Sequence, residues 1–144
     1  MNISKDFTVE QAITPTNGAA GTTTINGATC DMDGYDAVLM VVTMGAILAT
    51  AVTSIKAQES SDGTTWADLE GTAQTIADTD DDKTFYIDLE RPAKRYARLV
   101  VLRGTANATV AEALYFKRAS RARPVSQGAN VSGEIFYTPV AGTA

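Results

Sequence analysis

Two clusters of aspartate are the residues of this sequence whose spacing suggests metal binding. In the run 78–83, three aspartates alternate as in the first half of an EF-hand calcium loop. The second half of that loop is missing, because Lys83 stands where glycine is needed and Leu89 where a bidentate glutamate is needed. The turn at residues 31–36 holds three more aspartates. We interpret both clusters as solvated turns, and we expect no bound metal and no cofactor.

The sequence contains no histidine and a single cysteine, Cys30, which restricts its chemistry further. Histidine is the usual general base of serine and cysteine hydrolases and the commonest transition-metal ligand. One cysteine cannot form an internal disulfide or complete a Cys/His zinc site. We interpret Cys30 as a small buried or half-buried thiol. The catalysis left open is carboxylate chemistry in a cleft, such as glycoside hydrolysis, and we expect that the protein is not an enzyme.

The only tryptophan, Trp66, follows a tight turn at Asp62-Gly63. In one interpretation the returning chain lays the indole over the end of a hydrophobic core, and we favour this one. In the other, Trp66 is a platform on which a sugar ring stacks.

Charge is divided unevenly along the chain. Residues 1–90 hold 3 basic and 15 acidic side chains, a net charge of −12, whereas residues 91–144 hold 9 basic and 2 acidic ones, a net charge of +7. Such a split can be neutralised within one fold or between copies that meet head to tail. Nucleic-acid binding through the basic run 117–123 is disfavoured, because the acidic remainder repels phosphate and no aromatic motif accompanies the run.

The elements that would position these residues have the patterns of β-strands. Residues 1–34 carry two Asn-Gly turn markers and threonine-rich pieces typical of strands and loops. The apolar run 35–44 predicts a central strand buried on both faces. Residues 46–59 contain alanines that permit a helix, but their β-branched residues and the following turn favour a strand.

The clearest strand is predicted at residues 83–90, where Phe85, Ile87 and Leu89 alternate with polar residues and are expected to face inward. A turn containing a proline then leads into two further segments, 96–104 and 107–117, which we predict to pair as an antiparallel hairpin.

Short strands separated by turns, with no strongly amphipathic helix, predict an all-β fold: a single antiparallel β-sandwich, jelly-roll-like, over residues 1–120. Residues 121–144 mix arginines, a proline and glycines with a late apolar island, and we predict an extended C-terminal arm. We expect this island, Ile135-Phe136-Tyr137, to dock on its own domain or on a neighbouring subunit. A disordered tail is the alternative.

The length of 144 residues and the 44% hydrophobic content predict one compact core. No apolar run approaches the ~20 residues that span a bilayer, and the amino terminus has neither a basic start nor an apolar signal core. We expect a cytosolic product that does not enter a membrane.

Two short motifs frame the second half of the chain. Lys94-Arg95-Tyr96 opens the predicted hairpin, and Arg121-Ala122-Arg123-Pro124 follows it. With the stretch between residues 52 and 125, they resemble small structural proteins from the head-gene cluster of tailed bacteriophages. The resemblance implies a capsid decoration, or cement, protein that binds the outer surface of the capsid, often as a trimer, and reinforces contacts between major capsid subunits.

The resemblance implies the major capsid protein as partner, a homo-oligomer, most often a trimer, and a place on the virion after synthesis in the host bacterial cytoplasm. A role at the head–tail junction or in the tail is left open. We expect the subunit or capsid contacts to be made by basic and apolar residues near the C-terminus: Arg118, Arg121, Arg123, Ile135, Phe136 and Tyr137.

The segment that contains Trp66 also resembles a known family in its sequence pattern. A turn of the form Ser-x-Asp-Gly-x-x-Trp at residues 60–66, followed by the strand that begins at Arg95-Tyr96, is similar to discoidin-type carbohydrate-binding modules. This second resemblance implies a sugar-binding β-sandwich, which is our alternative function.

Overall fold

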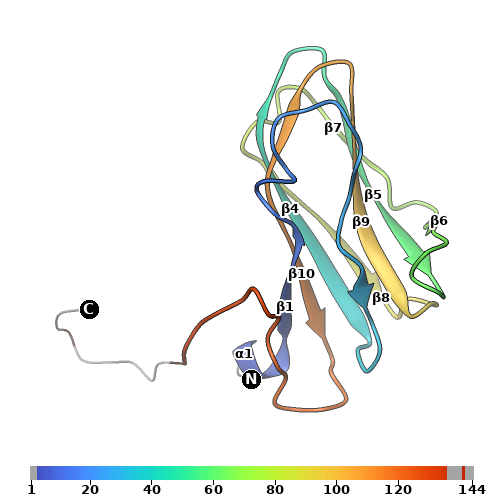
Figure 1. Cartoon of the computed structure of the whole chain (residues 1–144), viewed down its shortest axis with the longest axis vertical. Helices are drawn as coiled ribbons and strands as arrows, with labels where there is room; N and C mark the ends of the chain where they lie inside the picture. Colours follow the sequence, from blue (N-terminus) through green and yellow to red (C-terminus); the bar gives the residue numbers. More distant parts are fainter. Residues whose placement is uncertain (1–2, 136–140, 142–144) are drawn as a thin grey trace.

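The computed structural model describes residues 3–135 and residue 141, and it is built almost entirely of β-strands (Figure 1). One short helix precedes the strands. The elements are α1 (Ile3–Asp6), β1 (Thr8–Ile13), β2 (Ile25–Asn26), β3 (Cys30–Asp31), β4 (Ala37–Ile47), β5 (Val52–Ser60), β6 (Ala67–Asp68), β7 (Gln74–Ile76), β8 (Thr84–Glu90), β9 (Tyr96–Gly104) and β10 (Ala108–Arg118). Among the described residues, no helix is long and apolar enough to cross a membrane.

The strands form two antiparallel sheets that pack face to face. The first sheet has the order β1-β10-β4-β8, and the second has the order β2-β9-β5-β6, with β3 also paired to β9 and β7 to β5. If β2 with β3, and β6 with β7, are each counted as one interrupted strand, the fold has eight strands divided equally between two sheets. This is the arrangement of a jelly roll, and the predicted all-β sandwich of jelly-roll-like form is confirmed.

The core lies between the sheets because alternate residues of each long strand are buried. Methionines, valines and isoleucines of β4 and β5 meet leucine and valine residues of β9 across this layer. Tyr115 of β10 is fully buried among them. Its hydroxyl donates to the carbonyl of Ala28 and accepts from the amide of Leu99, both at 2.9 Å, so it ties the two sheets together.

Strand β8 confirms the prediction for residues 83–90, since Ile87 is buried and Phe85 and Leu89 pack against the core. The predicted central strand at residues 35–44 is β4, which lies between β10 and β8. The prediction that this strand is buried on both faces is wrong. Only one face of β4 meets the core, and the other face is the half-buried outside of the sheet.

The segment predicted as one strand at residues 46–59 belongs to two strands that are separated by a turn. Its first residues end β4 at Ile47, and β5 begins only at Val52. Between them the amide of Ala51 donates to the carbonyl of Leu48 at 3.0 Å, and Thr50 has a φ of 71°, so the chain reverses there.

The predicted hairpin of residues 96–104 with 107–117 is wrong. The two strands, β9 and β10, belong to opposite sheets, so the chain crosses the core between them. Both strands bury one face, and these faces look at each other across the sandwich. Arg103 fixes the crossing, because its guanidinium donates to the carbonyls of Ala108 at 2.8 Å and Ala19 at 2.7 Å.

Candidate functional site

The three arginines predicted to make subunit or capsid contacts are paired within the chain. Arg118 and Glu90 lie on either side of Ala37 in the ladder and form an ion pair. Arg121 lies 3.6 Å from the carboxylate of Asp36.

The third of these arginines, Arg123, lies 3.0 Å from the carboxylate of Asp6. The segment after β10 is therefore held against its own domain by charge.

This pairing extends to most of the basic half of the sequence. Six of the nine basic residues between positions 91 and 144 lie within 4.0 Å of a carboxylate contributed by residues 1–90: Lys94, Arg95, Lys117, Arg118, Arg121 and Arg123. Of the two sequence-based explanations for the charge split, neutralisation within one fold is the one that these pairs support. Lys117 is buried, but the other five pairs are at least partly exposed and contribute about 0–1 kcal/mol each, so they orient segments more than they stabilise them.

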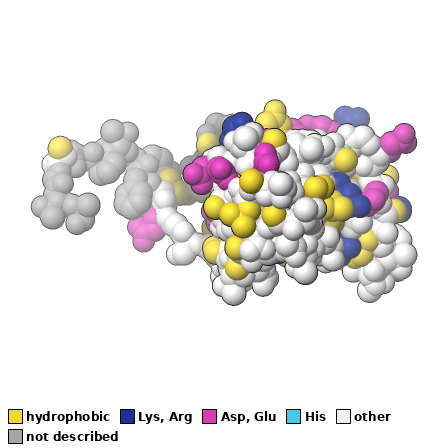
Figure 2. Space-filling view, turned by 90° about the horizontal axis from the view of Figure 1, so that it is seen from above, with side chains coloured by type: hydrophobic (Ala, Val, Ile, Leu, Met, Phe, Trp, Pro, Cys, Tyr) yellow, Lys and Arg dark blue, Asp and Glu magenta, His cyan; other side chains and the backbone are white. Residues whose placement is uncertain are grey.

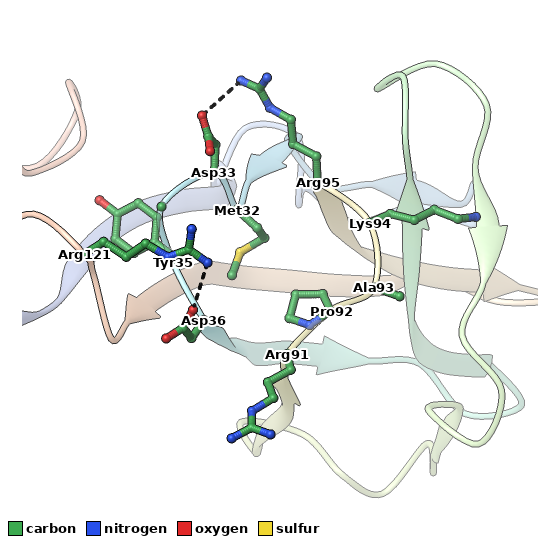
Figure 3. A pocket seen from close by; sticks show the side chains of 11 residues that line it. Met32, Asp33, Tyr35, Asp36, Arg91, Pro92, Ala93, Lys94, Arg95 and Arg121 are labelled. Atoms are coloured by element: carbon green, nitrogen blue, oxygen red, sulfur yellow. Dashed lines mark ion pairs between the residues drawn. The ribbon is translucent and has the colours of Figure 1, made fainter.

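A polar pocket of about 520 Å3 opens at one end of the sandwich, between residues 32–36 and 91–95 (Figure 3). Arg95 and Asp33 face each other across it at 4.0 Å, and Arg121 reaches Asp36 from the other side. Its two carboxylates are thus paired with guanidinium groups. The groups that the pocket offers a ligand are mainly the charged hydrogen-bond donors of arginine and lysine. This arrangement suits binding of a polar surface better than proton transfer.

Behind the pocket lies a buried lysine that sequence reasoning missed. Lys117 is only 5% exposed; its ammonium group donates to Glu10 at 2.6 Å and to the carbonyl of Asp31 at 3.2 Å, and it lies 4.4 Å from the centre of the Tyr35 ring. Its burial could have been predicted from its position in the strand. Residues 113, 115 and 117 alternate along β10, so Lys117 lies on the same inward face as Tyr115.

Cys30 is buried, as predicted. Burial raises the pKa of its thiol to about 12, and the nearby ammonium of Lys117 offsets this only in part. The thiol therefore stays protonated near neutral pH and is a poor nucleophile.

Trp66 is not the core residue that we favoured from the sequence. It is half-buried, and it does not belong to the hydrophobic cluster between the sheets. The guanidinium of Arg98, on β9, lies 4.2 Å from the centre of its ring, and Arg98 also donates to the side chain of Gln58 at 2.8 Å. The physical reason is the direction of side chains: Arg98 and Gln58 face each other on the outside of the second sheet, so the indole covers that outer face.

The aspartates of the acidic run bind backbone amides. Asp78 accepts from the amide of Thr50 at 2.9 Å, Asp81 from that of Ile47 at 2.6 Å, and Asp80 from that of Ala77 at 3.0 Å. The bonds of Asp78 and Asp81 tie the loop before β8 to the end of β4 and the β4–β5 turn, and the bond of Asp80 closes the loop on itself. In the part of the chain that the structure describes, no three acidic or cysteine side chains are grouped to hold a metal ion.

The arm begins as a segment anchored to the edge strand β1. The side chain of Gln127 accepts from the amide of Val9 at 2.9 Å and donates to the carbonyl of Phe7 at 2.8 Å. The amide of Gly128 adds a bond of 3.2 Å to the carbonyl of Val9. From Gly128 to Ile135 the chain passes beside the N-terminal segment that contains α1 (Figure 1).

Of the predicted apolar contact residues in this arm, Ile135 is 41% exposed. Phe136 and Tyr137 lie outside the described residues. The described part of the arm thus docks on its own domain, and Ile135 lines a pocket with Ile3 and Phe7 of the N-terminal segment.

A second surface that sequence reasoning missed is the outer face of the β1-β10-β4-β8 sheet. Adjacent rows of this face place Phe116 beside Leu39, and Leu114 beside Val41 and the 64% exposed Tyr86. The continuous apolar run of β4 was its signal, because a two-layer sandwich can cover only one face of each sheet.

Neither a protein-family model nor a curated protein matches this sequence. We therefore infer function from the arm, the outer sheet face and the paired charges.

Proposed function

We propose that this protein is a structural virion protein that binds the outer surface of a tailed-phage capsid and reinforces contacts between major capsid subunits. The observation that carries the proposal is the anchored arm of a jelly-roll domain, which is fixed along β1 by Gln127 and Gly128 and continues to Ile135, a residue that is 41% exposed. Jelly rolls are common as viral capsid domains. An arm that is anchored at its base and has an apolar stretch near the end of its sequence is suited to contacts between proteins.

The chemistry of the described residues supports a role in contacts. The carboxylates in the polar pocket are paired with arginines, and the single thiol is buried and protonated. Arg121 and Arg123 keep side chains that are 76% and 56% exposed, so both can contact a second protein while holding their own acidic partners. We accordingly propose a non-catalytic protein with no cofactor.

The partner in this proposal is the major capsid protein, and the protein itself is a homo-oligomer, a trimer. It is made in the host bacterial cytoplasm and resides on the virion surface, away from membrane and nucleic acid. Burying apolar area contributes about 25 cal/mol per Å2 before ordering costs, and repetition over a shell multiplies such modest contacts by avidity.

The test is the copy number of this chain in purified particles, measured by quantitative mass spectrometry. A decoration protein is present in a fixed ratio to the major capsid protein, since both follow the symmetry of the shell. A small constant number per particle would place it at the neck or tail instead. Its absence from particles would overturn the proposal.

A carbohydrate-binding module is the second candidate, and Trp66 is the observation that favours it. Its indole lies on the outer face of the second sheet beside polar side chains, since Lys56 and Gln58 both donate to Asp68 at 2.7 Å in the same region. Aromatic faces next to such groups are suited to sugar rings. Binding on a glycan array that is lost in Trp66→Ala, with folding retained, would support this function over the first.

A further inference from the structure

We propose that the open edge of β1 is a strand-pairing surface, and that residues 125–128 of the arm keep it closed against the same strand of a second copy of this chain. We call residues 125–128 the edge cover. The inference goes beyond the proposed function and does not depend on a role in capsids.

Strand β1 lies at one edge of the first sheet, where β10 is its only partner in the strand order. An edge strand presents backbone amides and carbonyls on its open side, and a strand of another chain can pair with them. On the open side of β1 the groups concerned are the carbonyl of Phe7 and both the amide and the carbonyl of Val9. All three are hydrogen-bonded to the edge cover.

The side-chain amide of Gln127 reproduces the hydrogen bonds of a paired strand. It donates to the carbonyl of Phe7 at 2.8 Å and accepts from the amide of Val9 at 2.9 Å. These two backbone groups flank Thr8, and a residue of a neighbouring parallel strand would bridge the same two groups. Gln127 therefore occupies the place of a strand residue.

The backbone of the edge cover follows β1 in the same direction. The amide of Val125 donates to the carbonyl of Lys5 at 3.1 Å, and the amide of Gly128 donates to the carbonyl of Val9 at 3.2 Å. A Cβ on Gly128 would lie 2.8 Å from the same carbonyl oxygen, so glycine permits this close approach. The two views in Figures 1 and 2 place the described arm at one side of the sandwich, where the edge strand β1 lies.

The opposite edge of this sheet, β8, carries a similar contact. Gln74 of β7 donates its side-chain amide to the carbonyl of Tyr86 at 2.8 Å. Covering an edge is one of the means by which proteins avoid edge-to-edge association. Glutamine side chains on both edges of one sheet support the interpretation that such bonds close sites of strand pairing.

The sequence of β1 explains why a second copy is the strand that must be excluded. Charges and prolines often protect edge strands, but β1 has no proline and a single charged residue, Glu10. Glu10 is paired with the buried Lys117, so its charge does not oppose pairing. Two uncovered β1 strands could pair antiparallel about a two-fold axis and join two four-stranded sheets into one.

The first experiment measures hydrogen exchange of the Val9 amide by NMR in the full chain. Gln127→Glu keeps the size of the side chain but replaces its donor with a carboxylate that faces the carbonyl of Phe7. Gly128→Val displaces the edge cover by a different route, through its Cβ. We expect the Val9 amide to exchange faster by about tenfold or more in both variants.

Ser126→Ala is the matched control, because Ser126 is exposed and only its carbonyl oxygen contacts Thr8. It should leave the exchange of the Val9 amide unchanged. Unchanged exchange in Gln127→Glu and in Gly128→Val would overturn the proposal that the cover closes this edge.

The second experiment tests what pairs with the uncovered edge, by light scattering after size exclusion. Gln127→Glu and Gly128→Val should form species larger than the wild-type chain at the same concentration. Adding Val9→Pro to Gln127→Glu should restore the wild-type mass, because proline removes the amide that pairing requires and is tolerated where an edge-strand amide faces outward. Circular dichroism establishes that each variant is folded.

A wild-type mass in both uncovered variants would overturn the proposal, and so would a larger mass that Val9→Pro does not reverse. All of these measurements use purified protein without capsids. Their failure therefore leaves the capsid role to the copy-number test, and failure of the capsid role leaves these results intact.

Discussion

The hydroxyl of Tyr115 fills a gap in the second sheet, and removing it should destabilise the fold measurably. Strands β2 and β3 both pair with β9 but are interrupted between residues 26 and 30. At this interruption the hydroxyl bridges the amide of Leu99 and the carbonyl of Ala28. A Cβ on Gly27 would come within 2.7 Å of the same oxygen, so the glycine makes room for it.

Tyr115→Phe leaves both backbone groups buried without this partner. A buried donor or acceptor left unpaired costs about 1–3 kcal/mol, so we expect a loss of about 2–3 kcal/mol in the free energy of unfolding. In a domain of this size each kcal/mol lowers Tm by about 2–4 °C. The loss is a large fraction of the ~5–15 kcal/mol that stabilises most domains.

The assay is urea unfolding followed by fluorescence and by circular dichroism. Tyr86→Phe is the matched control, because it removes a tyrosine hydroxyl from an exposed position on β8, in the same sheet as Tyr115, and we expect it to be neutral. The midpoint of Tyr115→Phe should fall with an unchanged m-value. A loss below about 0.5 kcal/mol, the range of ordinary surface substitutions, would refute the bridging role.

Three further predictions concern charges and Trp66. Trp66→Ala should cost about 1–2 kcal/mol, because the indole covers an outer face and Arg98, and a loss of about 3–5 kcal/mol in the same assay would return it to a core role. Raising the salt concentration should leave the oligomer mass unchanged, since the charges pair within the chain; dissociation in salt, seen by light scattering, would instead favour contacts through the charge split. Hydrogen bonding to Arg95 lowers the pKa of Asp31, so its stabilising effect is present above the unfolded pKa and is lost as pH falls through the lower folded pKa. Asp31→Asn should therefore lower Tm near neutral pH and have little effect near about pH 2; an equal loss at both pH values would contradict this role.

Local patterns in the sequence were sufficient for the fold class and for single strands. The alternation of Phe85, Ile87 and Leu89 predicted which face of β8 turns inward. Pairing was harder, because β9 and β10 alternate in the same way whether they lie side by side in one sheet or face each other across two. Only the position of a strand in the whole sandwich distinguishes these cases.

The candidate site shows the same division between local and long-range information. The basic character of Arg118, Arg121 and Arg123 is visible in the sequence, but their partners Glu90, Asp36 and Asp6 are distant along the chain. The fold brings these charges together, so their pairing has no local signal.

The outer face of the first sheet was hidden for a related reason. Leu39 and Val41 contribute to an apolar run that fits burial on both sides of a strand, and only a two-layer fold leaves one of those sides uncovered.

Binding of the purified full chain to capsids that lack it tests the proposed function most directly. Increasing amounts of protein are added, the capsids are sedimented, and the bound chain is quantified by mass spectrometry. We predict saturation at a fixed ratio to the major capsid protein. Failure to sediment with the capsids, or binding that rises without saturation, would contradict the account.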